Sequence, residues 1–383
     1  MSKEIKEKQK KKTVHKKKKN EIKIDSNKKH NGIISLWKFL YCIMIVVFHG
    51  GIFATKNSNV ILSNGSIGVE FFFIVSGYLM TKSALKYEDT SNIANDTVNY
   101  IWKKWKTFLP YTIISGVLAL LLINFHNKSF IIYNNVSAVW NIALLSMAGF
   151  KGTGANLPIW YISSMLLGMM ILYPIIKKYR LNFIYLFVPI ILIIGFGSLN
   201  SFYKDLRNPE VIILFTFKGN IRCILELLLG SVIYILCEKF KKIDFTKFGI
   251  LIITIIEISC LIMPMIVSHF VDHSTKYDYI LLVVISIGVL LAFSEKTLEY
   301  NILCNKFCYW LERISLTIYI FHFSIRIFCT NFSLFKKMNY INRLSIYLLL
   351  SILAGIIMMY IIDYLKKKNF YLNKFKKLII KSE

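Results

Sequence analysis

Two histidines in this sequence lie in or beside long apolar segments, where an ionisable side chain is costly and usually marks a function. His49 follows the nearly unbroken apolar run 39–48, and His322 lies within a second such run. Imidazole is the side chain that most often takes a proton from a substrate near neutral pH. His49 is therefore a candidate general base, and its alternative role is that of a hydrogen-bonded packing residue.

A carboxylate lies close to the first histidine in the chain. Glu70 enters the second apolar segment from the side on which His49 leaves the first, and the loop between them is short. The two segments are therefore expected to form an antiparallel helical hairpin. Glu70 would then orient His49 and stabilise its imidazolium, as a carboxylate does in hydrolytic triads. The alternative is an interfacial glutamate exposed to water, while Ser76 and Gly77 suit close packing against a neighbouring helix.

Four further charged residues fall in or beside apolar segments. Lys38 lies 11 residues before His49, about 16 Å along a helix, and by itself suits an anchor at the inner membrane interface. Arg222 and Glu226 are four residues apart, which predicts a structural ion pair within one helix. Glu257 has no evident partner nearby in the sequence and is a candidate for a protonated carboxyl group.

A cluster of lysines and tryptophans occupies residues 102–106 and precedes Pro110. Such residues are typical of a cytoplasmic membrane interface and need no special function there. The functional alternative is a seat for a phosphorylated cofactor that carries an aromatic base. Lys103, Lys104 and Lys106 would hold its phosphates as point charges, and a tryptophan would stack on the base.

The composition indicates which kind of protein carries these residues. Hydrophobic residues make up 55% of the 383 residues and charged residues only 18%, yet the formal net charge is +27. A soluble domain carries about 25% charged residues. These values exclude an ordinary cytosolic enzyme, a secreted disulfide scaffold and a disordered chain, and they leave a multi-spanning membrane protein. No zinc site is expected, because Cys304 and Cys308 form a single pair with no second pair to complete it.

Apolar runs long enough to cross a bilayer as helices predict about ten spans in an all-α bundle. Lysines and arginines concentrate in the segments between them that would face the cytoplasm, and the positive-inside rule therefore places both termini inside. The run 137–150 is short, and counting it as a span would worsen this charge distribution, so it is predicted to be interfacial or re-entrant. The predicted spans are 33–53, 67–83, 107–125, 158–176, 182–199, 221–238, 248–268, 278–294, 308–330 and 344–364.

Two basic tails flank the predicted transmembrane domain at 33–364. Residues 1–32 hold 13 lysines and four acids, and residues 365–383 hold seven lysines and one acid. The first tail is expected to be disordered in the cytoplasm and held near anionic lipid. Binding to nucleic acid is not expected, because no folded nucleic-acid-binding module accompanies the charge.

Together these residues resemble acyltransferase family 3, whose members are integral-membrane O-acyltransferases that modify cell-envelope glycans. Lys38 followed 11 positions later by His49 resembles the family's basic residue and histidine. Residues 71–78 resemble its Phe-Phe-x-x-Ser-Gly signature, the lysines before Pro110 its basic cluster, and residues 314–322 its late Ser…Tyr-Leu-x-His element. Two positions depart from the pattern, because Lys38 and Thr107 stand where the family usually has arginine.

The resemblance implies transfer of an acyl group, most often acetyl from acetyl-CoA, to a hydroxyl of a polysaccharide or lipid-linked glycan at the plasma membrane of a bacterium. Acetyl-CoA would be a co-substrate, with no bound cofactor. His49 would be the general base and Glu70 its orienting residue. The acceptor or the oxyanion would contact Ser76, Tyr161 or His322, and the donor phosphates would contact Lys38, Lys103, Lys104 and Lys106.

A different class of protein fits the same intramembrane charges. A transporter of polysaccharide or lipid-linked sugar would use them to line its pathway. The sequence shows no internal repeat of fixed period, which weakly disfavours transporters built from inverted repeats.

Overall fold

The computed structural model describes residues 31–56, 58–126, 132–150, 155–203, 205–271, 277–332 and 337–379. These residues are almost entirely helical, which confirms the all-α prediction for this part of the chain. The helices are α2 (Gly32–His49), α3 (Gly68–Leu85), α4 (Ile93–His126), α5 (Ile132–Ile142), α6 (Trp160–Asn182), α7 (Val188–Tyr203), α8 (Lys218–Phe240), α9 (Lys247–Phe270), α10 (Tyr277–Phe293), α11 (Tyr300–Leu303), α12 (Lys306–Asn331) and α14 (Tyr340–Ile379).

Short elements complete the fold. The strands β1 (Ile212–Ile213) and β2 (Thr216–Phe217) form one small antiparallel hairpin before α8. Single turns of 3₁₀ or π-helix extend or connect the long helices, and these are η1 (Gly50–Phe53), η2 (Gly65–Ile67), η3 (Ser146–Ala148), η4 (Leu157–Ile159) and η5 (Phe183–Phe187).

Each predicted span coincides with helix in the structure. Seven helical segments among the described residues are long and apolar enough to cross a membrane, judged by length and composition. One of them, Leu157–Tyr203, contains both α6 and α7. Arg180 interrupts it with a φ of 52°, inside the predicted loop 177–181. The count of ten spans remains a prediction, since α3 and α10 fall outside this set of seven.

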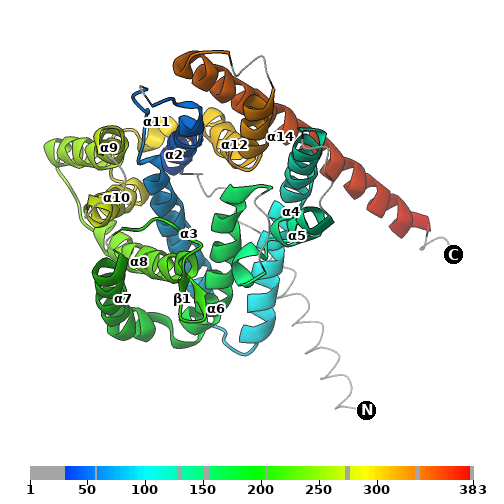
Figure 1. The fold of residues 1–383 in the computed structure, drawn as a ribbon. Helices are drawn as coiled ribbons and strands as arrows, with labels where there is room; N and C mark the ends of the chain where they lie inside the picture. Colours follow the sequence, from blue (N-terminus) through cyan, green and yellow to red (C-terminus); the bar gives the residue numbers. More distant parts are fainter. Residues whose placement is uncertain are drawn as a thin grey trace, which may run out of the picture.

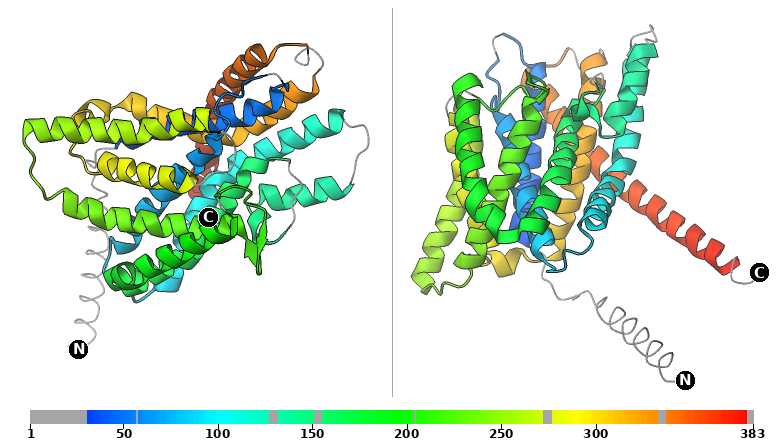
Figure 2. Two further views of the ribbon diagram at one scale, coloured as in Figure 1. Left: turned by 60° about the vertical axis from the view of Figure 1, so that its left-hand side comes forward. Right: turned by 90° about the horizontal axis from the view of Figure 1, so that it is seen from below.

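The helices run side by side as a bundle (Figures 1 and 2), with α12 packed against α2, α4 and α14. Helix α3 packs most extensively against α8. Gly77 and Gly230 permit this close approach, because a Cβ atom on Gly77 would overlap the backbone of Leu227 and one on Gly230 would overlap the backbone of Ile74. Small residues serve this purpose at many contacts between membrane helices.

Segments that the sequence assigns to the cytoplasmic side contact one another. Arg180 Nη1 donates a hydrogen bond to Tyr87 O over 3.0 Å. Lys241 and Glu295 form an ion pair with 3.2 Å between Nζ and Oε1. The first contact joins the predicted inner segments 84–106 and 177–181, and the second joins 239–247 and 295–307. Both contacts therefore link residues far apart in the sequence.

The run 137–150, predicted to be interfacial or re-entrant, turns back along α4. Trp105 Nε1 donates a hydrogen bond to Ala143 O over 3.1 Å, and Thr112 Oγ1 donates one to Ile142 O over 2.9 Å. Trp105 lies about 30 Å along α4 from the C-terminal end of that helix. Helix α5 and the residues after it therefore extend along much of α4, which fits a re-entrant segment rather than one lying flat on the surface.

The two predicted tails are only partly described. Nearly all of the first tail, residues 1–30, lies outside the described residues, as do residues 380–383. Beyond the predicted last span, which ends at residue 364, the backbone stays helical to Ile379. This extension of α14 projects away from the bundle (Figure 2).

Candidate active site

Five helices of the bundle enclose a cavity of about 590 Å³, a typical size for a small-molecule site. Helices α2, α3, α4, α6 and α12 each contribute side chains to it. Most of its lining is apolar or aromatic, and the polar and charged groups among its lining residues are Lys38, Ser76, Lys104, Thr107, Tyr111, Tyr161, Tyr309, Glu312, Arg313, Ser315 and Tyr319.

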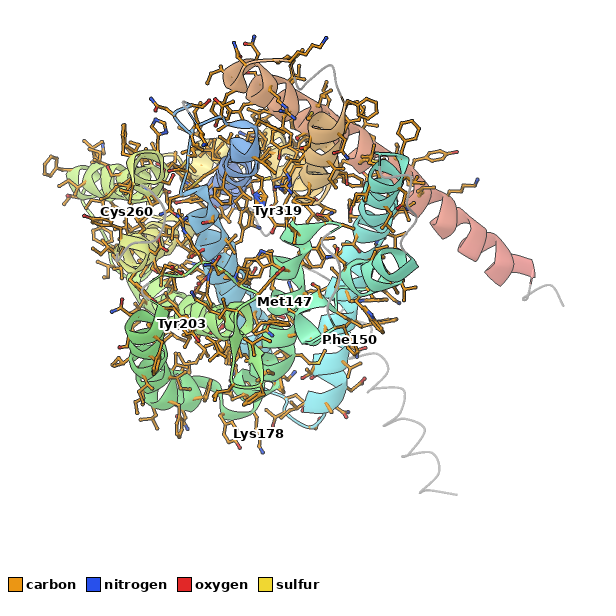
Figure 3. The ribbon with its side chains drawn as sticks, in the orientation of Figure 1. Met147, Phe150, Lys178, Tyr203, Cys260 and Tyr319 are labelled. Atoms are coloured by element: carbon orange, nitrogen blue, oxygen red, sulfur yellow. The ribbon has the colours of Figure 1, made fainter. Side chains whose placement is uncertain are left out.

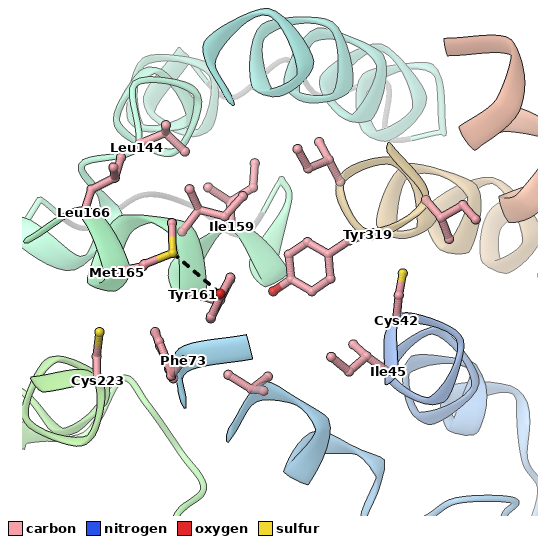
Figure 4. Close-up of a cluster of buried hydrophobic side chains, with 14 of the residues drawn as sticks. Cys42, Ile45, Phe73, Leu144, Ile159, Tyr161, Met165, Leu166, Cys223 and Tyr319 are labelled. Atoms are coloured by element: carbon pink, nitrogen blue, oxygen red, sulfur yellow. Dashed lines mark hydrogen bonds between the residues drawn. The ribbon is translucent and has the colours of Figure 1, made fainter. Parts of the chain in front are cut away.

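Four residues singled out from the sequence line this cavity together. Lys38 and Lys104 come from α2 and α4, and Ser76 and Tyr161 come from α3 and α6. The hydroxyl oxygens of Ser76 and Tyr161 are 3.4 Å apart, within hydrogen-bonding distance. The buried Tyr161 also donates a hydrogen bond to Met165 Sδ, shown in Figure 4. The structure therefore places predicted donor-binding and acceptor-binding residues on one connected surface.

Lys38, expected to contact the donor phosphates, already has an anionic partner in the structure. Its ammonium group pairs with Glu312 of α12, whose other carboxylate oxygen accepts a hydrogen bond from Ser35 over 3.0 Å. Arg313, the next residue, pairs with Asp363. Lys104 forms no ion pair in the part of the chain that the structure describes, and its Nζ lies 5.2 Å from the ring centroid of Tyr100. Lys104 is thus the lining lysine without an ion-pair partner among the described residues.

The other two lysines of the basic cluster do not line the cavity. Lys103 and Lys106 are exposed, and Lys106 Nζ lies 4.8 Å from the ring centroid of Trp102. The rings of Trp102 and Trp105 stack on each other with centroids 5.0 Å apart. The structure therefore places only one lysine of this cluster where it could contact a donor inside the cavity.

Three aromatic rings meet at the other end of the cavity. The centroid of Phe72 is 6.1 Å from that of Tyr161 and 6.3 Å from that of Tyr319, and the two tyrosines are 5.8 Å apart. Figure 3 shows Tyr319 near the centre of the bundle, and Figure 4 shows the two tyrosines pointing toward one another from α6 and α12. Tyr319 is fixed by donating its hydroxyl hydrogen to Pro158 O over 2.7 Å. We call these three residues the aromatic layer.

The two histidines lie together beside the aromatic layer. Their ring centroids are 5.1 Å apart with the rings nearly perpendicular, and His322 lies 5.8 Å from Tyr319. His322 is fully buried, and its Nδ1 is 2.6 Å from Tyr319 O. A carbonyl oxygen only accepts, so Nδ1 carries the hydrogen and the lone pair of neutral His322 is on Nε2. His322 Nε2 and His49 Nδ1 have no hydrogen-bond partner among the described residues.

The predicted partner of His49 lies elsewhere. Glu70 pairs with Arg222, which also donates a hydrogen bond to Glu226 over 2.9 Å as predicted. The ring of Trp160 covers this guanidinium with 5.5 Å between the ring centroid and Cζ. Burial explains the correction, because a carboxylate at the start of α3 that is 1% exposed needs a cation, and Arg222 on the adjacent α8 supplies one.

Sequence reasoning missed several contacts that shape the site. Glu312 neutralises Lys38 from 274 residues away, and no local spacing could indicate that. Glu257, which has no evident partner nearby in the sequence, accepts a hydrogen bond from the distant Trp37 Nε1 over 2.9 Å. The family resemblance assigned both histidines to one site, and the structure adds that their rings are in contact.

The comparison with known proteins agrees with this geometry. No curated protein and no solved structure matches the chain significantly. Residues 31–363 match the acyltransferase domain that defines acyltransferase family 3. The match includes both histidines and every residue that lines the cavity. The chain therefore belongs to acyltransferase family 3 and is a membrane acyltransferase.

Proposed function

We propose that the protein is an O-acyltransferase of the bacterial plasma membrane that moves acetyl from acetyl-CoA to a hydroxyl of a cell-surface polysaccharide or a lipid-linked glycan. One observation carries this proposal. A cavity with cationic residues at one end is in contact, through Tyr319, with a pair of histidines that lie beyond it. A charged donor and a hydroxyl acceptor can then approach one reaction centre from opposite sides.

The cationic end of the cavity suits the donor. Lys104 has no carboxylate partner in the described part of the chain, whereas Arg313, which also lines the cavity, pairs with Asp363. Phosphate groups would bind there, and the long uncharged arm of CoA would extend past Ser76 toward the aromatic layer. Lys38 keeps a smaller role, since Glu312 already balances its charge.

The histidine pair suits removal of the acceptor proton. His49 is only partly buried, whereas His322 is fully buried, so that the acceptor hydroxyl reaches His49 first. His322 Nε2 bears a lone pair without a partner and lies beside the His49 ring. After His49 takes the proton, a small rotation of its ring would let it donate to His322 Nε2. The imidazolium would thereby be stabilised by a neighbour on α12, the role first expected for Glu70.

The proposed reaction is a direct transfer. The acceptor oxygen attacks the thioester carbonyl while His49 takes its proton, and the carbon–sulfur bond then breaks. The thiolate of CoA receives this proton from His49 and leaves as the free thiol, so that His49 returns to its neutral form. Ser76 and Tyr161 both have hydroxyl groups at the deep end of the cavity, where they can donate hydrogen bonds to the developing oxyanion.

The test measures ester content of envelope glycans in a deletion strain that expresses wild type, His49→Ala or His322→Ala. Loss of a general base lowers rates about 10²- to 10⁴-fold, so ester should disappear with His49→Ala. His269→Ala is the matched control, because this exposed histidine on α9 lies outside the cavity and the histidine pair. Full ester content with a normally expressed His49→Ala protein would refute its catalytic role. If the deletion stops polymer export and the polymer never carried ester, the protein is a transporter instead.

A further inference from the structure

One arginine lies beside the histidine pair without any role so far. Arg326 is on α12, one helical turn after His322. Its Cζ lies 3.9 Å from the ring centroid of Phe323, and the His49 ring contacts that same phenyl ring with centroids 6.2 Å apart. The guanidinium and the proposed base are therefore held against one side chain.

Arg326 differs from Arg222 and Arg313, two other arginines of the bundle, in lacking an anionic partner among the described residues. Arg222 pairs with Glu70 and Glu226, and Arg313 pairs with Asp363. Within the described ranges, the Arg326 guanidinium forms no ion pair and no hydrogen bond with a carboxylate. The loops that follow α4 and α12, residues 127–131 and 333–336, contain no Asp or Glu in the sequence.

A second arginine adds positive charge at the same end of the bundle. Arg343 of α14 donates from Nη2 to Cys329 O over 2.8 Å, and Cys329 lies one turn after Arg326 on α12. Its Cζ lies 4.4 Å from the ring centroid of Phe53, and its buried Nε has no hydrogen-bond partner among the described residues. Two guanidinium groups thus lie over phenyl rings at this end of the bundle, and neither is neutralised by a described carboxylate.

We propose that Arg326, assisted by Arg343, forms a subsite for a negatively charged group of the acceptor, a phosphate or a carboxylate. The inference rests on the proposed function and names the acceptor class, a glycan that is anionic close to the hydroxyl that receives the acyl group. A guanidinium held over an aromatic ring still offers the N–H groups of its planar fork, which suit two-point binding of an oxyanion. An unpaired charge in an apolar bundle is costly, and an anionic ligand would remove that cost.

The bound anion would also assist the chemistry. Arg326 by itself disfavours a second positive charge on His49, which forms when the histidine takes the acceptor proton. A phosphate or carboxylate seated between them would offset that repulsion. An acceptor with the anion would therefore react faster than a neutral glycan of the same length, even where both reach the site.

The main test compares glycans from the deletion strain expressing wild type, Arg326→Gln, Arg326→Lys or Lys56→Gln. Extracted glycans are separated by anion exchange, and ester is measured in the retained and unretained fractions. Wild type should place its ester in the retained fraction. Arg326→Gln should lower that ester about 10- to 100-fold, the range expected for one charge-assisted contact, and Arg326→Lys should retain part of it. Lys56→Gln removes a charge from an exposed residue in the η1–η2 loop and should change nothing.

The source of the anion is distinguished by chemical treatment of the retained glycan. Hydrogen fluoride cleaves phosphodiesters, and it should release the ester-bearing unit from the polymer if the anion is phosphate. Carbodiimide-mediated reduction of carboxyl groups should instead abolish retention of the ester-bearing material if the anion is a carboxylate. Either result supports the subsite.

A second measurement covers the case in which Arg326→Gln fails to fold. In membranes that contain the wild-type protein, inorganic phosphate or glucuronate should inhibit ester formation, and glucose at the same concentration should not. Equal inhibition by all three, wild-type ester on unretained neutral glycan, or full ester with a folded Arg326→Gln protein would each overturn the subsite. Absence of ester from every wild-type fraction would instead overturn the proposed function itself.

Discussion

At the scale of single residues, the two cavity lysines are not equivalent. Lys38 follows the family pattern in its spacing from His49, but its charge is balanced by Glu312. Lys104 has the weaker sequence signal, since it belongs to a cluster that any membrane interface explains equally well. Its lack of a carboxylate partner in the described part of the chain makes it the stronger candidate for contact with donor phosphates.

Replacing Lys104 by alanine should raise the KM for acetyl-CoA about tenfold, which corresponds to about 1.4 kcal/mol of binding free energy. The maximal rate should change much less, because the lysine contacts a part of the donor that does not react. The measurement is initial rate against donor concentration in membranes. Lys106→Ala is the matched control, since this exposed lysine of the same helix lies outside the cavity. Equal effects of the two variants would contradict this assignment.

Glu70 is the opposite case. It directly precedes the Phe-Phe-x-x-Ser-Gly signature, yet its partner in the structure is Arg222 and not the proposed base His49. Its buried pairing with Arg222 predicts that Glu70→Gln destabilises the protein by about 1.5–3 kcal/mol, because a charge-assisted hydrogen bond is weakened while Glu226 still neutralises Arg222. Replacing Glu70, Arg222 and Glu226 together by Gln, Met and Gln should recover much of this loss. Thermal unfolding in detergent measures both effects. A Glu70→Gln protein as stable as wild type but inactive would restore the catalytic role expected from the sequence.

At the scale of elements, α8 packs against both α3, which carries Ser76, and α6, which carries Tyr161. Gly230→Ala should lower the unfolding free energy by about 1–3 kcal/mol, because the added methyl group meets the backbone of α3, which cannot move aside as a side chain could. Gly197→Ala on α7 is the control. No atom lies within 4 Å of its Cβ position, so this change should be neutral or stabilising by about 0.5–1 kcal/mol. Similar losses of unfolding free energy in Gly230→Ala and Gly197→Ala would show that the close approach of α3 and α8 contributes little to stability.

The helices were predictable because apolar length is a strong signal, and each predicted span does coincide with helix. The turn at Arg180 was predictable from the charges around it. Pairings between helices were not, because Lys38–Glu312, Glu70–Arg222 and Trp37–Glu257 each join residues more than 150 positions apart. The sequence therefore predicted which residues could belong to the site. The structure was needed to show which side chains these residues contact.

At the scale of the whole molecule, the predicted orientation can be tested with single introduced cysteines. Phe215, at the tip of the β1–β2 hairpin, is 94% exposed, and Lys242 lies exposed in the loop after α8. With Cys260 and Cys304 replaced by serine, a membrane-impermeant maleimide applied to intact cells should label Phe215→Cys. It should label Lys242→Cys only after the cells are permeabilised. The reverse pattern would invert the orientation, and labelling of both sites in intact cells would contradict the proposed ten spans.

The aromatic layer has an electrical consequence for the cell. A plasma membrane holds a potential, and each elementary charge moved across 100 mV requires about 2.3 kcal/mol. Phe72, Tyr161 and Tyr319 meet at ring-contact distances between the cationic cavity and the histidines, so they act as an insulator at the middle of the bundle. In the proposed reaction an acetyl group passes this insulator toward the acceptor and the acceptor's proton passes it toward the CoA thiolate, an exchange that moves no net charge. The polyanionic CoA stays on its own side, and the modification of the outer surface proceeds without drawing on the membrane potential or discharging it.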